Sequence, residues 1–529
     1  MTGTALAPAP AGLAAAMRWE ERVQRGAHPL VYPAIRALRH RGPVVRVPGI
    51  GVVVSDAATA RAVLLDSEHF SKVGPGSPSD LWTPVLGPSV LLNMEGADHA
   101  RLRRALSGLF TPRAVRDLVA VSVPDVLAGL APRLLAGERV DLVAETATMA
   151  GTVVCAMTGL PPTDAAVREA MTAAQSVVGL VRLHRRSLTA GQVRHARAVL
   201  ARLSAPARDA YRAGDPATVP GRMRELGLSE DEALGAVGAF VLTGTETIQS
   251  FVPRLVALAA DTGWLDQLLA ADPGAGPEAA ALRGRVVEEA LRVTAPTPAM
   301  LRSVRADATV GDVRVRAGDR VVIATISCCK DAGPFDPDAP VDPAVRHLWF
   351  GAGPHFCLGM PLAVAQVDAV LDALRPVVTA GRSIEVVDRA VARGVLIPAY
   401  RSLVVRAVGG EVRAPGQVAG SAASSAGAAA CARPAARPAT CSPRSSPAGP
   451  PGTRPPTRSR SGAGRGRAAA VRACARRPRT PTSRGASRRP RRRSRPMASR
   501  RARAPWSRCG PGRRASCARA GLARGHISA

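Results

Sequence analysis

The residues best suited to chemistry surround Cys357. They form a glycine-rich run, Phe350-Gly351-Ala352-Gly353-Pro354-His355-Phe356-Cys357-Leu358-Gly359, ahead of a predicted helix over 362–374. A thiolate that binds a metal at the face of a flat macrocycle needs a backbone that turns sharply, and the glycines, which lack a Cβ, permit this. The start of the next helix favours the thiolate form of Cys357. The alternative is a buried cysteine in an ordinary glycine-rich loop.

This ten-residue pattern resembles the haem loop of the cytochrome P450 family, with every expected position filled. The resemblance implies a mainly α fold with small β-sheets, a helix-rich triangular prism around a buried haem b (iron protoporphyrin IX). It makes Cys357 the iron ligand and assigns Phe350, Gly351 and Gly359 to cofactor binding. His355 is placed to reach a carboxylate at the edge of the macrocycle.

Basic residues elsewhere agree with the resemblance. His99 and Arg103 stand one helical turn apart, which suits two donors that grip a haem propionate by charge-assisted hydrogen bonds. Arg302 resembles the family's further propionate-binding arginine. The alternative for His99 and Arg103 is a basic surface helix.

Glu289 and Arg292 stand three residues apart on a predicted helix, close enough to pair. Such pairs usually lie on solvated surfaces. Followed by Ala295-Pro296-Thr297-Pro298, this one resembles the family's buried structural pair. Ala339 departs from the family pattern, because an arginine normally joins the pair there, and this puts stability and haem retention in doubt.

A fourth segment, Thr243-Gly244-Thr245-Glu246-Thr247, resembles the part of the family's central helix that crosses the distal face of the haem. The resemblance makes Glu246 and Thr247 the proton relay to bound oxygen and Gly244 the space for it. Thr243 stands where the family has Ala or Gly, so its side chain enters the pocket. Alternatively, the threonines only bond back to helix carbonyls. Pro253 should kink this helix or remove a hydrogen bond.

Long helical patterns dominate the rest of the chain. Strand signals occur at 43–54 and 308–326, and helical patterns at 98–110, 113–136, 142–158, 191–213, 229–262 and 277–293. The expected result is a helix-rich chain with small sheets and not an alternating α/β protein.

Charge divides the chain sharply. Residues 411–529 contain 28 arginines and one acid, whereas residues 1–410 hold 44 basic and 39 acidic side chains. We expect a flexible segment over 1–14, a haem domain over 15–410 and a disordered Arg/Ala/Pro/Ser-rich tail over 411–529. Translation of a GC-rich reading frame other than the original one would give the same tail composition. Cysteine usage and the absence of a membrane-spanning run favour a cytoplasmic protein with reduced thiols. We also expect a monomer.

The function implied by the resemblance is a monooxygenase that hydroxylates or epoxidises an apolar small molecule of secondary metabolism, terpenoid or polyketide-like. Electrons would come from a separate ferredoxin and ferredoxin reductase docking on the cysteine side of the haem. By analogy with the family, the pocket is lined by residues 81–92, 171–183, 239–243, 296–300 and 396–398. The alternatives are a haem-binding protein without turnover and a nucleic-acid-binding protein driven by the basic tail.

Overall fold

The structure, a computed structural model, describes residues 11–181 and 187–409. The predicted tail over 411–529 lies outside the described residues. Helix α1 (Ala11–Ala27) already begins within the expected N-terminal segment 1–14. Helices account for most of the described chain, and three small sheets accompany them, so the prediction of a mainly α fold is confirmed.

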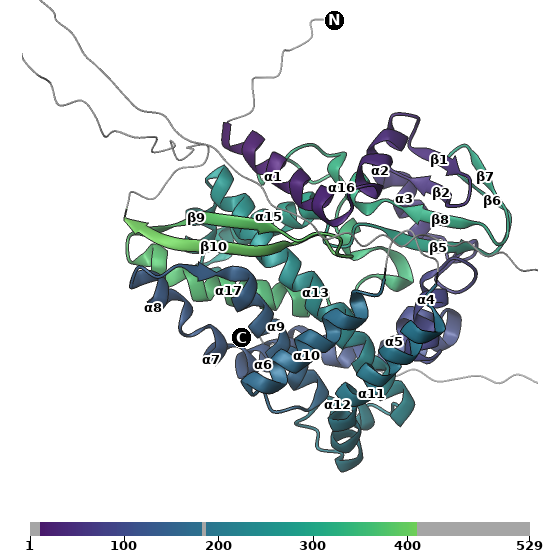
Figure 1. The fold of residues 1–529 in the computed structure, drawn as a ribbon, viewed down its shortest axis with the longest axis horizontal. Coiled ribbons are helices and arrows are strands. Elements are labelled where there is room, and N and C mark those ends of the chain that lie inside the picture. Colours follow the sequence, from purple (N-terminus) through teal and green to yellow (C-terminus); the bar gives the residue numbers. More distant parts are fainter. Residues whose placement is uncertain (1–10, 182–186, 410–529) are drawn as a thin grey trace, which may run out of the picture. The chain divides into compact units, whose positions relative to one another are not determined.

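The longest element is helix α13 (Glu230–Thr262), which runs through the interior of the body (Figure 1). Its first residue follows a capping box, in which the Ser229 hydroxyl accepts from the Glu232 N–H and the Glu232 carboxylate accepts from the Ser229 N–H. Gly263 ends the helix in the left-handed conformation at φ 81°. The helix continues past Pro253, so the proline removes one N–H donor without ending it.

Other helical predictions are confirmed within a few residues. They correspond to α5 (Gly96–Ser107), α9 (Leu142–Thr158), α11 (Ala190–Ala213), α15 (Pro277–Thr294) and α17 (Met360–Thr379). The prediction of one helix over 113–136 is wrong. That stretch forms α6 (Pro112–Ser122), α7 (Pro124–Leu127) and α8 (Leu130–Leu135), because Pro124 has no N–H to continue α6.

Further helices complete the body, and the sequence analysis did not predict them. They are α2 (Val31–Arg39), α3 (Ala57–Leu65), α4 (Pro78–Leu86), α10 (Asp164–Val178), α12 (Val219–Glu225), α14 (Leu265–Ala270) and α16 (Thr325–Lys330). Short 3₁₀ turns join some of them: η1 (Leu91–Asn93), η2 (Gly108–Phe110), η3 (Pro273–Ala275), η4 (Leu348–Phe350) and η5 (Gly353–His355).

A five-stranded sheet has the order β1-β2-β8-β5-β3. The predicted hairpin over 43–54 is confirmed as β1 (Val44–Val47) and β2 (Gly51–Val54), which pair antiparallel. The strand signal over 308–326 divides between β6 (Ala308–Val310) with β7 (Val313–Val315), which form a separate two-stranded sheet, and β8 (Arg320–Ile323). Strand β8 runs parallel to β2 and antiparallel to β5 (Met300–Val304), and β3 (Phe70–Ser71) pairs with β5.

The third sheet is a long hairpin that the sequence analysis did not predict. Strands β9 (Arg382–Val391) and β10 (Tyr400–Gly409) pair antiparallel, and β4 (Val140–Asp141) adds to the edge of β10. In Figure 1 the hairpin lies beside α1 on the opposite side of the body from the five-stranded sheet. The turn of the hairpin, residues 392–399, returns to the interior.

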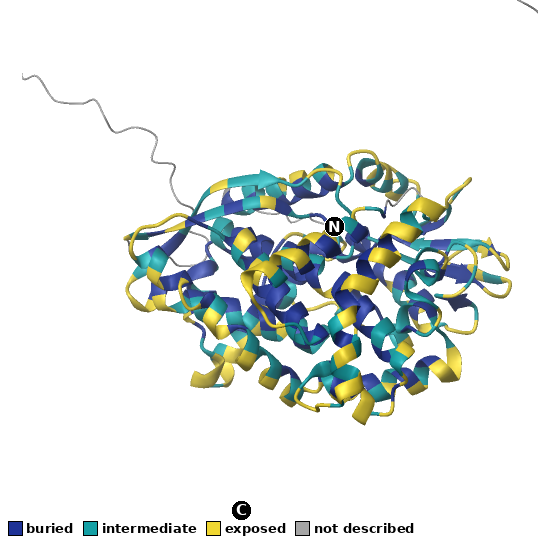
Figure 2. Ribbon diagram, turned by 60° about the horizontal axis from the view of Figure 1, so that its bottom comes forward, coloured by how far each residue is buried: buried dark blue, intermediate teal, exposed yellow. Residues whose placement is uncertain are grey.

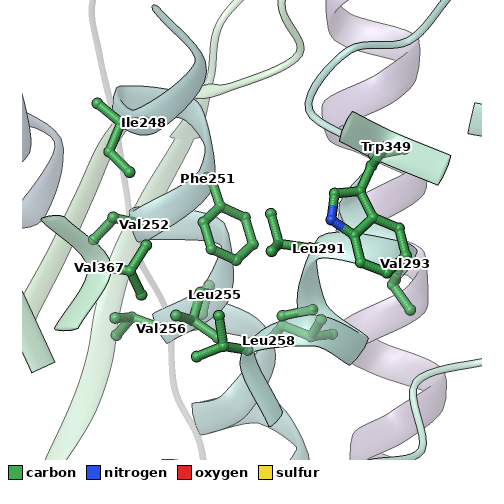
Figure 3. Packing of buried hydrophobic residues seen from close by; sticks show 14 of the residues in the cluster. Ile248, Phe251, Val252, Leu255, Val256, Leu258, Leu291, Val293, Trp349 and Val367 are labelled. Atoms are coloured by element: carbon green, nitrogen blue, oxygen red, sulfur yellow. The ribbon is translucent and has the colours of Figure 1, made fainter. Parts of the chain in front are cut away.

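The core forms around α13. Figure 3 shows Phe251 of α13 beside Leu291 of α15, with Trp349 beyond Leu291 and Val367 of α17 near Val252 and Val256 of α13. Figure 2 shows buried residues on the inward faces of the helices and exposed residues on their outer faces. Burial of these apolar side chains, at about 25 cal/mol per Å² of apolar surface, holds the helices in place.

Glu289 and Arg292 form an ion pair in which Arg292 is buried and Glu289 is partly buried. The Arg292 guanidinium, 7 % exposed, donates to both oxygens of Glu289 at 2.7 and 2.5 Å. It also donates to the carbonyls of Cys329, Gly333 and Pro334. The N–H of Asp336 donates to Glu289 at 2.8 Å, so a backbone donor supplies the contact although residue 339 is alanine.

By length and composition, no single helix in the described ranges could span a membrane, although α6 with α7 and α8 passes that test as a pair bent by 53°.

We predict that Arg292→Leu lowers the free energy of unfolding by about 3–5 kcal/mol, because it leaves the Glu289 carboxylate buried without its partner. Urea denaturation followed by circular dichroism measures this. The matched control is Arg285→Leu on the same helix, whose guanidinium is 48 % exposed and lies 3.5 Å from Asp338. Its loss should cost less than about 1 kcal/mol. Equal losses in both variants would contradict the prediction.

Candidate functional site

The loop that carries Cys357 is built from two 3₁₀ turns and the start of α17. The Cys357 N–H donates to the Phe350 carbonyl at 2.9 Å and closes the loop. Gly351 and Gly353 have φ values of 83° and 68°, which disfavour residues with a Cβ. A Cβ on Gly353 would also lie 2.8 Å from the Leu64 carbonyl oxygen. These two glycines therefore fix the turn before Cys357.

Gly359 contributes in a different way from that expected. Its φ is −82°, and an added Cβ would lie 3.9 Å from the Cys357 sulfur, an ordinary contact, so the protein atoms do not require glycine there. The Cys357 side chain is exposed on one side, but the protein groups packed around it raise the pKa of its thiol by desolvation. The backbone N–H groups of Gly359 and Met360 and the charges of Lys72 and Arg103 act in the opposite direction.

Basic side chains from four parts of the chain converge near Cys357. We call Lys72, His99, Arg103, Arg302 and His355 the basic cluster. The rings of His99 and His355 lie 4.2 Å apart between centroids. Lys72 interacts electrostatically with Arg302, Arg103 and Cys357. The structure thus brings together every basic residue that the sequence analysis assigned to cofactor binding.

One carboxylate lies within the cluster. Glu95 accepts from the His355 ring at 2.9 Å, from the Ser71 hydroxyl at 3.1 Å and from the Lys72 backbone N–H at 2.5 Å. Burial opposes ionisation of Glu95, yet these hydrogen bonds lower its pKa to about 2. Glu95 is therefore an anion at neutral pH.

Glu95 alone does not satisfy this many buried nitrogen donors. Burial lowers the pKa of Arg302 to about 10, of Lys72 to about 7 and of His355 to about 4. Burial also lowers the pKa of His99 and Arg103. The buried Nε2 of His99 has no hydrogen-bond partner within the described residues. Such a set of donors fits a ligand that brings additional carboxylates, as the two propionates of haem do.

Lys72 and Glu95 are the members of this site that the sequence analysis missed. Lys72 follows the two-residue strand β3, and Glu95 precedes helix α5. Neither Lys72 nor Glu95 belongs to a sequence motif whose spacing indicates cofactor binding. An acid four residues before His99 was the only local signal.

The segment 243–247 lies in the middle of α13. Thr243 and Gly244 are exposed although Val241, Leu242 and Thr245 beside them are buried. A Cβ on Gly244 would meet no atom within 4 Å. This side of the central helix therefore faces open space within an otherwise buried stretch.

The threonines of this segment bond back to their own helix. Thr243, Thr245 and Thr247 donate to carbonyls four residues earlier at 2.8, 3.1 and 3.0 Å. Their hydroxyl oxygens can still accept hydrogen bonds. Oε1 of Glu246 is buried without a partner in the described structure, and burial raises the pKa of this carboxyl.

Two cavities adjoin the site. One, of about 330 Å³, lies outside the cysteine loop and is lined by His99, Ala100, Arg103, Arg104, Ser107, Gly353 and Pro354. The other, of about 480 Å³, is lined by residues that include Ser71, Glu95, Asp98 and Arg305. The first connects the cysteine loop and the basic cluster with the outer surface of α5.

Comparison with known proteins identifies the family. Residues 282–374, which include the Glu289 pair and the Cys357 loop, match the model described as Cytochrome P450. The chain is 30 % identical over 376 residues to "Cytochrome P-450 monooxygenase DoxA" of Streptomyces sp. (strain C5), which covers 64 % of this chain and 85 % of the relative. The chain belongs to the cytochrome P450 family.

Other cytochromes P450 are similar over much of their length. The "20-oxo-5-O-mycaminosyltylactone 23-monooxygenase" of Streptomyces fradiae is 31 % identical over 356 residues, 64 % of this chain and 80 % of that protein. P450BioI, in complex with an acyl carrier protein ligated to hexadec-9Z-enoic acid, superposes with a TM-score of 0.60 at 21 % identity, covering 72 % of this chain and 99 % of that one. The expected cytochrome P450 fold is therefore confirmed.

Cytochromes P450 bind haem, so this chain is a haem protein and an enzyme of the monooxygenase class. The donor set described above fits that cofactor. Cys357 offers its sulfur in a tightly turned loop, and the basic cluster offers hydrogen-bond donors to the carboxylates of the cofactor.

We predict that Lys72→Met weakens haem retention by about tenfold, because it removes one charged hydrogen-bond donor from the propionate site. Transfer of haem to excess apomyoglobin, followed by the Soret band, measures this without enzymatic turnover. Arg104→Met is the matched control, since Arg104 is an exposed cation on helix α5 next to Arg103. Loss at the same rate from both variants would show that Lys72 does not hold the cofactor.

Proposed function

We propose that this cytochrome P450 uses Cys357 as the axial ligand of haem b and oxidises an apolar polyketide-like or terpenoid-like small molecule of secondary metabolism. The observation that carries the proposal is the basic cluster beside the Cys357 loop. It provides donors for two propionates, and within the described residues Glu95 is the carboxylate that hydrogen-bonds to it.

We assign a role to each site residue from its place in the structure. Cys357 binds the iron, and His99, Arg103, Arg302 and His355 hold the propionates. Phe350, Gly351 and Gly359 shape the loop against the cofactor, since Gly351 needs its positive φ and the Phe350 carbonyl accepts from Cys357. Glu289 and Arg292 keep the helix behind this loop in place.

Haem supplies reductive activation of dioxygen for insertion into a C–H or C=C bond. Glu246 and Thr247 hold and move the required protons. Burial raises the pKa of the Glu246 carboxyl, so this group keeps its proton to a higher pH than an exposed glutamate and is suited to donate it. Gly244 leaves room for dioxygen, and Thr243 narrows the pocket beside it.

The substrate class follows from apolar walls and from relatives. Trp82, Leu86, Leu180 and Leu396 pack around a buried aliphatic cluster that includes Val241 and Leu242 of α13. Such walls suit an apolar molecule of medium size. Relatives include a mycaminosyltylactone monooxygenase and an erythromycin C-12 hydroxylase, which supports oxidation of a polyketide.

Electrons come from a separate ferredoxin and its reductase. The cavity outside the Cys357 loop is lined by His99, Arg103 and Arg104, which favours an acidic partner there. The expected cytoplasmic location and monomeric state stay predictions.

Two other functions remain distinguishable. A haem protein without turnover would not need an unpaired carboxyl such as Glu246 in its central helix. Nucleic-acid binding through residues 411–529, which lie outside the described structure, would give salt-dependent binding that is lost when these residues are deleted.

The reduced carbon-monoxide difference spectrum tests the central claim. We expect a thiolate-type Soret band in the full chain and in a truncation that ends at Gly410, and its loss in Cys357→Ala. Recovery of haem binding only in the truncation would make the tail a disabling extension. Absence of the band in both wild-type forms would contradict the assignment of Cys357.

We also predict that Glu246→Gln lowers product formation by about 10²-fold or more, because a proton relay is lost, while haem content is unchanged. Product and hydrogen peroxide are measured with a surrogate ferredoxin and an apolar compound that the wild type oxidises. Peroxide should rise as product falls. Thr245→Ala, on the buried side of the same helix, is the control and should keep both yields. An unchanged product yield in Glu246→Gln would rule out the relay.

A further inference from the structure

A buried polar network outside the haem site surrounds Arg254. Arg254 of α13 is 1 % exposed, and Glu20 of α1 is 5 % exposed. The guanidinium Nε donates to Glu20 Oε2 at 3.1 Å, and Nη2 donates to Glu20 Oε1. A residue of the central helix is thereby joined to the N-terminal helix by a bidentate ion pair.

The remaining donors of Arg254 bind two backbone carbonyls. Nη1 donates to the Pro398 carbonyl at 3.0 Å, and Nη2 donates to the Thr294 carbonyl at 2.5 Å. Ser250, one turn earlier on α13, donates its hydroxyl to the same Pro398 carbonyl at 2.6 Å. Gln24 of α1 donates to the Thr294 carbonyl at 3.2 Å. Each carbonyl is therefore held by two side chains.

Each carbonyl lies in or next to a segment that the sequence analysis assigns to the substrate pocket: Pro398 belongs to 396–398, and Thr294 lies just before 296–300. Thr294 precedes the segment 295–298, and Ala295 adopts φ 37°, a left-handed conformation that is unfavourable for a residue with a Cβ. Pro398 ends the segment 396–398, and Leu396 packs against the same apolar cluster as Trp82 and Leu86. The network therefore binds the strained turn at Ala295 and the turn that carries Leu396, whose side chain packs against the apolar cluster.

Helix α1 holds the second turn from its other side. The Gly394 N–H donates to the Gly26 carbonyl at 3.0 Å, and the His28 ring contacts the Leu396 carbonyl at 2.9 Å. A Cβ on Gly26 would lie 2.4 Å from a methyl carbon of Val391. In Figure 1, α1 lies along the β9–β10 hairpin. The turn 392–399 is therefore fixed between α1 and α13.

Stability alone is a weak reason to bury this ion pair. Removing two charges from water costs free energy that the pair only partly recovers, so an apolar replacement is often as stable. What an apolar pair lacks is a planar group of donors that can bind Glu20 and two carbonyls at once.

We propose that Arg254, oriented by Glu20, is a positioning residue that sets the shape of the substrate pocket by fixing the turns at 294–298 and 396–398. The proposal rests on the proposed function, because the segments 296–300 and 396–398 line a substrate pocket only by the resemblance to this family of enzymes. Arg254 contacts neither substrate nor haem in this role. It acts through the carbonyls of Thr294 and Pro398.

A second ion pair, between the β9–β10 hairpin and α13, serves as a matched control. Arg389 of β9 donates to both oxygens of Asp261 on α13 at 2.7 and 2.8 Å. This pair is also largely buried, with exposures of 11 % and 17 %. It joins α13 to the same hairpin, yet it does not bind the Pro398 or Thr294 carbonyl. A general loss of packing between α13 and the hairpin would therefore affect both pairs alike.

The test compares the haem-loaded wild type with Arg254→Lys, Ser250→Ala, the double variant Glu20→Gln with Arg254→Met, and the control Arg389→Lys. The probes are imidazole and 4-phenylimidazole, whose binding to the iron is followed by the Soret shift. Imidazole reports access to the iron, and the phenyl group adds contact with the pocket walls. Hydrogen–deuterium exchange of the peptide 392–399 reports the turn directly.

In Arg254→Lys and in the double variant, we expect the ratio of the two dissociation constants to change by about tenfold or more, because a misplaced wall affects the larger ligand only. Exchange of 392–399 should accelerate by a similar factor. Ser250→Ala removes one donor and should change the ratio by about threefold. In Arg389→Lys, both values should stay within about twofold of wild type.

An unchanged ratio in the folded Arg254 variants, or an equal change in Arg389→Lys, would overturn the proposal. If the Arg254 variants do not fold, Ser250→Ala provides the test, because it leaves the ion pair between Arg254 and Glu20 intact. An unchanged ratio of the two dissociation constants in Ser250→Ala would then overturn the proposal. A wild type without a thiolate Soret band would contradict the proposed function instead. The exchange arm would then still show whether Arg254 fixes the turn.

Discussion

Buried positive charge requires nearby negative charge, and this requirement organises the centre of the molecule. Lys72, His99, Arg103, Arg302 and His355 come from different elements, and burial lowers the pKa of each. Glu95 balances only a part of this charge. The sheet that carries Arg302, the helix that carries His99 and the loop that carries Cys357 are therefore mutually dependent on a ligand with carboxylates. In this family that ligand is haem.

The central helix connects this site with the rest of the body. Its first half packs against the leucines of α5 and against Leu358, next to Cys357. Its second half packs against α15, which holds the Glu289 and Arg292 pair. The exposed residues Thr243 and Gly244 lie between these halves. One long helix therefore sets the distance between the distal segment and the elements that carry the iron ligand.

The sequence predicts those features that are encoded by continuous stretches of the chain, and it does not predict those that depend on residues far apart in the sequence. The Cys357 loop and the helix α13 are continuous stretches, so their glycine pattern, caps and periodicity are readable. Lys72 and Glu95 are isolated residues that only the tertiary fold brings to the basic cluster. The helix predicted over 113–136 fails at Pro124, where a proline compatible with a helical start ends one helix and begins another.

Two further differences have physical causes. The φ of Gly359 is an ordinary −82°, so its backbone conformation alone does not require glycine. Ala339 offers no side-chain donor where the family has an arginine, and Glu289 instead accepts from Arg292 and from the Asp336 N–H. Neither a backbone dihedral angle nor a backbone donor can be read from residue types alone. The roles of the individual site residues stay predictions.

The attachment of α1 also has a consequence for how the chain folds during synthesis. Glu20 finds its partner 234 residues later, and the His28 ring contacts a carbonyl 368 residues later. Contacts of such separation form slowly, because a long loop must close before they contribute free energy. The N-terminal helix leaves the ribosome first and completes its contacts among the last, with its inward face exposed to solvent or to chaperones in the interval.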